Sequence, residues 1–310
     1  MTTPKITVIT PTYNRADFLE KTIESVLYQT FSDFEYYILD DGSTDNTEDI
    51  VRNYLNDKRV KYIKYENSGE ATTVNKGWQL AKGEYFTQVN SDDPILPTLF
   101  EEMVKALDSE PEKVLAYPDF YFINENDEIT YETKSPDWNF TEALSNYACY
   151  PASAGTFIRR LAFSDWKTIK NSPYKHINDT EMYWKMALVG DFLHVPKTLA
   201  NWRVHSGQIS SKRYLCIPEV YDWYNNYFQQ ENLPKDILNV KETTKFTIFK
   251  YLIELINESE LAKTIDVKKE SHIQKIIAKY IYKYGIRPLL MILFEKNKVK
   301  ANCDILIKKY

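Results

Sequence analysis

The sequence has 310 residues, of which 43% are hydrophobic and 27% charged, and a net charge of −5. These values are ordinary for a soluble protein and leave room for one large α/β domain with an appendage, or for two domains. The longest apolar run is far shorter than the roughly 20 residues that span a bilayer, and no signal segment precedes the first expected strand. We therefore expect a cytoplasmic protein. Cys149, Cys216 and Cys303 follow no metal-ligand spacing and are expected to be reduced.

Charge is distributed unevenly along the chain. Residues 261–310 hold twelve Lys or Arg against four Asp or Glu, a net of +8, so residues 1–260 carry −13. An acidic body argues against nucleic acid as a partner. The basic tail is either a helix with a solvated lysine face or a segment that contacts an anionic membrane surface, where each Lys or Arg contributes about 1 kcal/mol.

Strand and helix patterns alternate over the first third of the chain. Short β-branched runs indicate buried parallel strands, and apolar residues three and four positions apart indicate amphipathic helices. Asp45 and Glu48 resemble a capping box for the second helix, and Gly83 resembles the residue that ends the third. The expected strands are residues 6–10, a segment ending at Asp40 and Asp41, residues 60–65 and a segment beginning at Tyr85. This alternation predicts a mostly parallel sheet covered by helices.

The pattern changes after a helix expected over residues 97–107. Residues 114–132 predict an antiparallel hairpin with a turn at Asn126 and Asp127. The elements expected next are a short helix near Thr141, a strand over 152–159, a helix over 179–190, a pair of short strands over 191–207 and helices beyond Ser211. We place a domain boundary near Ser210, between residues 1–210 and a helical C-terminal region of residues 211–310.

Two adjacent carboxylates end the strand within residues 84–94. Asp92 and Asp93 follow its apolar residues, and Pro94 stops the ladder of hydrogen bonds. Ligands of open α/β sheets bind at this carboxyl edge, and neighbouring carboxylates favour a divalent cation that also binds a substrate's phosphates. The alternative is a simple turn before the next helix.

A sugar nucleotide would match the polar residues expected at this edge. Asp40 could accept a hydrogen bond from the base or a ribose hydroxyl, with Thr10 and Tyr13 on the other side. Asp92 could bind the ribose and Asp93 the metal, which would stabilise the leaving diphosphate. No G-x-G-x-x-G follows the first strand and no P-loop motif occurs, which weakens dinucleotide-binding and P-loop interpretations.

Two later residues each have two interpretations. Asp179 is either a general base for an acceptor hydroxyl or the N-cap of the helix that begins there. His205 follows a strand and is either a metal ligand or a hydrogen-bonded structural residue. The remaining histidines, His176, His194 and His272, are interpreted as structural.

Together these motifs resemble the family-2 glycosyltransferases of the GT-A fold. The segments TVITPTYNRADFLEKTIESVLYQT, LDDGSTDNT, NSGEATTVNKGWQLAKGEY, NSDD and NDTEMYWKMALVG…LANWRVHSGQIS occur in the family's order over roughly residues 5–211. The resemblance implies a Rossmann-like α/β fold with a mostly parallel central sheet, a nucleotide-sugar half over about 1–95 and an acceptor half over about 96–210. It also implies inverting transfer with manganese or magnesium.

The resemblance also implies roles for single residues. Asp93 would bind the metal, His205 would lie near the metal and diphosphate, and Asp179 would be the catalytic base. The residues on the nucleotide-sugar side would be Thr10, Pro11, Thr12, Tyr13, Asp40, Asp41, Asn75 and Asp92.

Three positions depart from the family's pattern. Asn178 stands where Glu commonly precedes the base, Val74 where Arg often precedes Asn75, and Asn90 where the first acid of the Asp-x-Asp-Asp run is common. None of them removes the base or the metal ligand, so we predict an active enzyme.

The predicted function is transfer of a sugar from a nucleoside-diphosphate sugar, expected to be a UDP-sugar, to a hydroxyl of a glycan or lipid-linked acceptor in bacterial surface polysaccharide synthesis. Two alternatives stay open: a nucleotidyltransferase that forms sugar nucleotides, and a non-catalytic module that binds a glycan or nucleotide. For the helices beyond Ser211 the open roles are covering the acceptor side, a homodimer contact, and peripheral docking at the inner face of the cell membrane.

Overall fold

The computed structural model describes residues 3–163, 172–206, 208 and 216–258. It consists of two compact units, the first comprising Met1–Ala143 with Ala148–Ser211 and the second Leu144–Tyr147 with Lys212–Tyr310. The basic segment 261–310 and its expected helices lie outside the described residues. The division of the chain at residue 210 into a transferase domain and a helical region stays a prediction.

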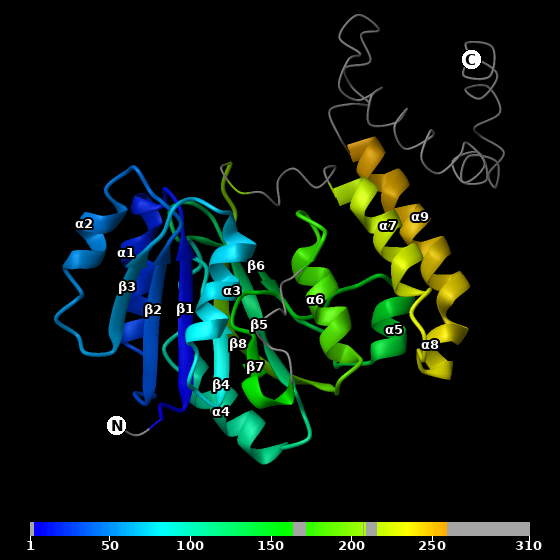
Figure 1. The fold of residues 1–310 in the computed structure, drawn as a ribbon, viewed down its shortest axis with the longest axis horizontal. Coiled ribbons are helices and arrows are strands. Elements are labelled where there is room, and N and C mark those ends of the chain that lie inside the picture. The colour runs from blue at the N-terminus through cyan, green and yellow to red at the C-terminus, as the bar shows by residue number, and fades with distance from the viewer. Residues whose placement is uncertain (1–2, 164–171, 207, 209–215, 259–310) are drawn as a thin grey trace, which may run out of the picture. The chain divides into compact units, whose positions relative to one another are not determined.

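A single mixed sheet forms the centre of the first unit (Figure 1). Its strands are β1 (Ile6–Thr12), β2 (Phe34–Asp40), β3 (Val60–Lys64), β4 (Tyr85–Gln88), β5 (Leu115–Ile123), β6 (Ile129–Thr133), β7 (Phe157–Arg159) and β8 (Phe192–Arg203). They lie in the order β3-β2-β1-β4-β7-β5-β6, with β8 beside β5. Strands β1 to β4 are parallel, as are β5 and β8, whereas β6 and β7 run against their neighbours. The predicted mostly parallel sheet is therefore confirmed.

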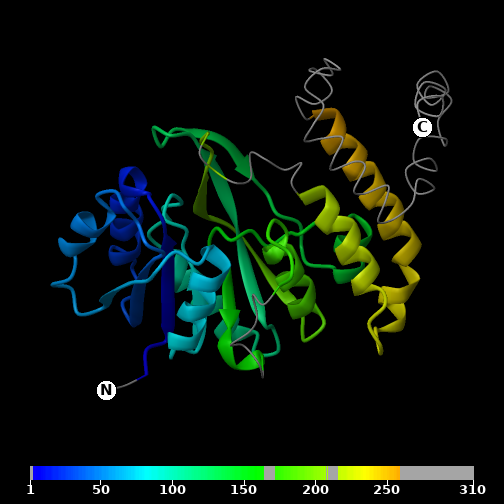
Figure 2. The same ribbon diagram turned by 45° about the horizontal axis from the view of Figure 1, so that its top comes forward.

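Helices cover both faces of this sheet (Figure 2). They are α1 (Ala16–Leu27), α2 (Thr47–Arg52), α3 (Glu70–Leu80), α4 (Leu99–Ser109) and α6 (Asn178–Ala187), and a further short helix, α5 (Phe140–Ser145), lies between β6 and β7 in the chain. Apolar residues of α1, α2 and α4 pack on one face, beside Ile6 and Val8 of β1. Residues of α3 and α6 pack on the other face, which includes Ile9 of β1. Side chains of a strand alternate between faces, so strands such as β1, β2 and β5 contribute to both cores, whereas β6 is largely exposed.

The second unit contains α7 (Ile217–Tyr227), α8 (Lys235–Asn239) and α9 (Lys241–Glu258). Trp223 stacks on Tyr227 within α7, and the Tyr224 hydroxyl donates to the carbonyl of Lys241 at the start of α9.

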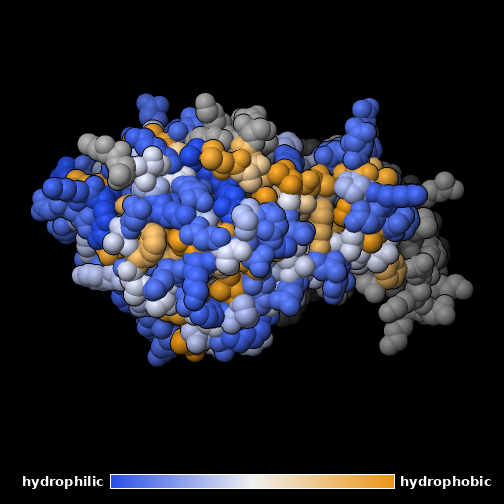
Figure 3. Space-filling view, turned by 90° about the horizontal axis from the view of Figure 1, so that it is seen from below, coloured by the Kyte–Doolittle hydropathy of each residue, from blue (hydrophilic) through white to orange (hydrophobic). Residues whose placement is uncertain are grey.

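None of the helices in the described residues is long and apolar enough to cross a membrane. On the face shown in Figure 3, apolar residues lie in several groups among hydrophilic ones.

Two expectations about strands are wrong. One continuous strand, β8, replaces the expected pair of short strands. Pro118 pairs with Val195 and Asp119 with Thr198, so the two residues after Val195 bulge out of the ladder. The first of them is a proline, which has no N–H to donate and is tolerated at a bulge. The strand expected over 152–159 is confined to β7, because Gly155 has a φ of +77° and turns the chain before it.

Two expectations about helix ends are also wrong. Helix α2 has Asn46 as its N-cap, and Glu48 bonds Arg52 at 2.6 Å instead of completing a capping box. Asp45 instead accepts the N–H of Thr47 at 3.1 Å. Helix α3 ends at Leu80, before Gly83. A Cβ at Gly83 would lie 2.5 Å from the backbone nitrogen of Thr7, so this glycine allows a close approach to β1.

Candidate active site

The carboxyl ends of β1, β2 and β4 meet at one edge of the sheet because these strands are parallel. Thr12 at the end of β1 is in register with Asp40 at the end of β2, and the N–H of Asp41 donates to the Thr12 carbonyl at 2.9 Å. The loop after β4 carries Asn90 to Asp93. The sequence motifs that end these three strands therefore lie at the same edge.

Asp92 and His205 face each other at this edge. Asp92 Oδ2 lies 3.0 Å from His205 Nε2 and 3.7 Å from Nε of Arg15. The Asp92 side chain is 18% exposed, whereas the His205 ring is buried and packs on Phe18, with ring centroids 5.1 Å apart. A carboxylate oxygen and an imidazole nitrogen this close together fit a divalent cation that takes its other ligands from phosphates.

Asp93 has different surroundings from its neighbour. It is 5% exposed, its Oδ1 accepts the N–H of Arg203 at 2.7 Å, and its Oδ2 accepts the amide of Asn90 at 2.9 Å. Burial, together with the charge of Asp92, raises the pKa of Asp93 to about 7. Asp93 thus attaches the loop after β4 to β8, and the geometry favours Asp92 over Asp93 as the metal-binding carboxylate.

The carboxylates after β2 stabilise loops. Asp40 has no exposed surface, and its oxygens accept the N–H of Ser43 at 2.7 Å and the hydroxyl of Tyr62 at 2.5 Å. Asp41 is 4% exposed, and its oxygens accept the N–H groups of Ser68 and Gly69, both at 2.8 Å. Both carboxylates are thus enclosed by protein hydrogen bonds, and the roles expected for Asp40 and Asp41 toward the nucleotide stay predictions.

The residues at the end of β1 differ in burial. Thr10 is fully buried and its hydroxyl bonds the hydroxyl of Tyr36 at 2.9 Å, so it belongs to the core. Pro11 is also buried. Thr12 Oγ1 is buried and has no hydrogen-bond partner among the described residues, whereas Tyr13 is 47% exposed. Asn75 is half-buried on α3.

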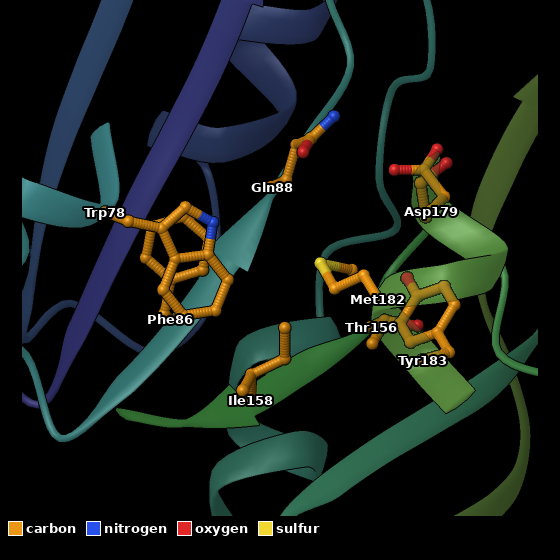
Figure 4. A pocket seen from close by; sticks show the side chains of 9 residues that line it. Trp78, Phe86, Gln88, Thr156, Ile158, Asp179, Met182 and Tyr183 are labelled. Atoms are coloured by element: carbon orange, nitrogen blue, oxygen red, sulfur yellow. The ribbon is translucent and has the colours of Figure 1, made fainter. Parts of the chain in front are cut away.

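A pocket lies between β4, β7 and α6 (Figure 4). It holds about 310 Å³ of empty space counted out to its mouth. Trp78, stacked on Phe86 with centroids 3.8 Å apart, forms one wall with Ile158, and Met182 lies opposite. These apolar residues are all nearly fully buried. The polar lining residues are Gln88, Ser153, Thr156, Asp179 and Tyr183.

Asp179 lies at the start of α6 and is half-buried in this pocket. Burial and the charge of Asp179 raise the pKa values of Cys149 and Tyr183. The N-cap of α6 is Ile177 and no side chain caps the helix, so the alternative interpretation of Asp179 as the N-cap is not supported. Asp179 is thus placed to act inside the pocket.

A chain of hydrogen bonds connects the pocket with the carboxylates after β4. Gln88, which lines the pocket, donates to Asn90 Oδ1 at 2.7 Å. The Asn90 amide donates to the Ser153 hydroxyl at 3.1 Å and to Asp93. Asp93 and Asp179, which are far apart in sequence, therefore belong to one connected region.

Sequence reasoning missed several residues of this region. Arg203 is 1% exposed and bonds the loop that carries Asp92 and Asp93. The one available signal was its position two residues before His205, since alternate residues of a strand face the same side. No pattern singled out Gln88 or Ser153, because their role depends on how distant strands pair.

The candidate ligands for a divalent cation are Asp92 and His205. The described residues contain no cluster of three or more His, Cys, Asp or Glu side chains that could hold a metal ion. The pair of Asp92 and His205 nevertheless fits one, since such ions are often bound by one or two protein ligands together with a substrate's phosphates.

Comparisons with known proteins identify the family and the fold. The sequence model of glycosyl transferase family 2 matches residues 7–166. The chain is 30% identical over 213 residues to a hyaluronan synthase of Pasteurella multocida, covering 68% of this chain and 21% of that protein.

Two solved structures resemble the fold. TarS of S. aureus in complex with UDP-GlcNAc gives a TM-score of 0.63 at 17% identity, over 93% of this chain and 80% of that one. The mannosyltransferase PcManGT of Pyrobaculum calidifontis in complex with GDP-Man and Mn²⁺ gives 0.56 at 15% identity, over 96% and 89%. The fold is that of GT-A glycosyltransferases. With a sequence match that spans half of its length, this chain belongs to glycosyl transferase family 2.

Proposed function

We propose that this glycosyltransferase is a metal-dependent, inverting enzyme that moves a sugar from a nucleoside-diphosphate sugar to a hydroxyl of a glycan or lipid-linked acceptor. The observation that carries the proposal is the hydrogen-bonded path from Asp93, the sequence neighbour of Asp92, through Asn90 and Ser153 to the pocket of Asp179, with Asp92 facing His205 beside it. Such a transfer needs one group on the leaving diphosphate and another on the attacking hydroxyl.

Each end of this path has a chemical role. Asp92 and His205 would hold manganese or magnesium, which when bound offsets the charge that develops on the leaving diphosphate. The oxygen of the acceptor hydroxyl forms a bond to the anomeric carbon, and the bond from that carbon to the diphosphate breaks. Asp179 takes the proton that the hydroxyl loses. Attack from the side opposite the diphosphate inverts the configuration.

Polar and apolar residues of the pocket have different roles in binding the substrate. Gln88 and Ser153 are half-buried and can hydrogen-bond sugar hydroxyls, whereas Trp78 and Phe86 form a buried apolar wall that excludes water. A UDP-sugar donor is supported by the UDP-GlcNAc complex of TarS. A role in bacterial surface polysaccharide synthesis is supported by the similarity to a hyaluronan synthase.

The test separates the two ends of the site. Purified protein is assayed with UDP-sugars and GDP-mannose, with Mn²⁺, Mg²⁺ or EDTA, for release of nucleoside diphosphate and for transfer to glycan acceptors. Asp179→Asn should lower the rate of transfer by about 10²- to 10⁴-fold and leave Mn²⁺·UDP binding unchanged. Asp92→Ala should weaken Mn²⁺·UDP binding.

Asp191→Asn is the matched control for the base variant. Asp191 is exposed and contacts Lys113 at 3.5 Å, away from the pocket lining. It should keep full transfer activity. Full activity of Asp179→Asn would exclude Asp179 as the base. Release of pyrophosphate from a nucleoside triphosphate and a sugar phosphate would favour a nucleotidyltransferase instead.

A further inference from the structure

Arg203 at the end of β8 has unusually dense contacts for a residue outside the pocket lining. It is 1% exposed, and the hydrogen bonds of its side chain in the described residues go to oxygens of the loop after β4 and of the turn between β5 and β6. A buried guanidinium is costly unless each of its donors is satisfied. This arrangement therefore identifies Arg203 as a structural link between two distant loops.

The first loop is the one that carries the carboxylates. Arg203 Nε donates to the carbonyl of Asp92 at 2.8 Å, and the N–H of Arg203 donates to Asp93 Oδ1 at 2.7 Å. The backbone of Asp92 and the side chain of Asp93 are thus both held by one residue of β8. Two positions further on, His205 faces Asp92 Oδ2.

The second loop is the turn between β5 and β6. Arg203 donates to the carbonyl of Asn124 at 2.8 Å and to Asp127 Oδ1 at 2.5 Å. The other oxygen of Asp127 pairs with Lys21 of α1. Asp127 has a φ of +67°, so the turn places its side chain by a backbone conformation that few residue types adopt.

Phe18 of α1 completes the arrangement. The Arg203 guanidinium lies 4.8 Å from the centroid of its ring, and the His205 ring packs on the same side chain. Cation–π contact and ring packing thereby fix Arg203 and His205 against one helix. The orientation of both candidate metal ligands depends on the same small group of residues.

We infer that Asp127 and Arg203 are positioning residues for the metal and diphosphate, and that the turn between β5 and β6 acts as their support. The inference rests on the proposed function. Asp127 orients the guanidinium of Arg203, which in turn holds the backbone carbonyl of Asp92. The carboxylate of Asp92 is thereby held against His205. Residues that orient metal ligands in this way typically change metal affinity or activity by about 10- to 100-fold when replaced.

Two variants test this role without adding backbone strain. Asp127→Gly removes the carboxylate and tolerates the positive φ, and Arg203→Lys keeps the charge but loses the planar fork. Glu125→Ala is the matched control, because Glu125 is an exposed acid of the same turn whose backbone carbonyl, not its side chain, contacts Arg203.

Two quantities are measured. The first is the affinity for Mn²⁺ in the presence of UDP, determined from the electron paramagnetic resonance signal of free Mn²⁺. The second is the Mn²⁺ concentration that gives half-maximal turnover. Asp127→Gly and Arg203→Lys should lower this affinity and raise this half-maximal Mn²⁺ concentration, each by about tenfold or more, while kcat at saturating Mn²⁺ changes much less. Glu125→Ala should match the wild type. A circular-dichroism melt establishes that the compared proteins are folded.

Two other results have distinct meanings. If both variants fold with a lower melting temperature but bind Mn²⁺ and UDP as the wild type does, Arg203 and Asp127 only stabilise the fold and this inference is wrong. If the wild type itself does not bind Mn²⁺ with UDP, or Asp92→Ala binds it unchanged, the proposed function is wrong. If Asp127→Gly does not fold, Arg203→Lys and Asp127→Asn decide the question by the same measurements.

Discussion

Asp92 and Asp93 are adjacent in sequence but differ in exposure and in hydrogen bonding. Asp92 retains contact with solvent and faces a histidine, whereas Asp93 is buried and bonds Arg203 and Asn90. Both oxygens of Asp93 must give up protein hydrogen bonds before they can bind a cation, whereas a cation at Asp92 could bind the carboxylate and the His205 ring that now face each other. Which of these two aspartates can bind a cation therefore depends on their hydrogen bonds and not on their residue type.

This difference gives a prediction for single substitutions. Asp92→Asn should weaken the binding of Mn²⁺ with UDP by about tenfold or more, because it removes a charged oxygen ligand. Asp93→Asn should change that affinity much less, since an amide oxygen can still accept the N–H of Arg203. Isothermal titration calorimetry of each variant measures the effect. A larger loss for Asp93→Asn would restore Asp93 as the metal ligand.

At the scale of elements, β8 organises much of the first unit. It pairs with β5 along its length, carries Arg203 at its end and leads to His205. Near its start, His194 lies between two acids, with Nε2 3.0 Å from Asp119 of β5 and Nδ1 2.9 Å from Asp137. This cluster joins β5, β8 and the segment after β6, and it agrees with the structural role expected for His194.

The Asp119 cluster predicts a pH-dependent loss of stability. Burial raises the pKa of Asp119, but hydrogen bonds from His194, the N–H of Ser135 and Lys134 outweigh it and hold the pKa below its usual value. A carboxyl whose pKa is lower in the folded state stabilises the protein above its unfolded pKa, near 3.9, and loses this contribution as pH falls through the folded pKa.

Asp119→Asn should therefore lower the free energy of unfolding by about 1–3 kcal/mol at pH 7. The difference from the wild type should shrink as pH falls below about 4, where Asp119 itself becomes protonated. Urea denaturation at several pH values measures it. Asp137→Asn is a useful comparison, because the side chain of Asp137 is 96% exposed and should contribute little. A difference that stays constant down to pH 2 would contradict the assignment.

For the whole molecule, ligand binding and stability are linked. A nucleoside diphosphate with Mn²⁺ that binds only the folded chain should raise the free energy of unfolding by about 2.7 kcal/mol at 100 times its dissociation constant. We expect UDP with Mn²⁺ to raise the melting temperature more than GDP or ADP, and EDTA to remove the shift. Thermal denaturation followed by fluorescence measures this. Equal shifts for all three nucleotides would contradict a UDP-specific donor site.

Local patterns predicted much of the architecture. The alternating strands and helices up to Asp93 and the hairpin of β5 and β6 agree with the structure, because β-branched runs, helical spacing and turn residues act within a few positions of one another. The bulge in β8 and the short β7 were not predicted, since both depend on pairing with β5. The contacts of Asp40 with Tyr62 and of Asp93 with Arg203 likewise join residues far apart in sequence.

The sequence by itself determined the fold class, the family and the set of acids at the carboxyl edge of the sheet, because each is encoded in short motifs and their order. Only the tertiary structure decided which of these acids is open to a ligand and which is enclosed by hydrogen bonds. The physical reason is that burial and hydrogen-bond partners are properties of the packed chain: Asp93 is enclosed by Arg203, 110 residues away, while Asp92 beside it is left facing His205.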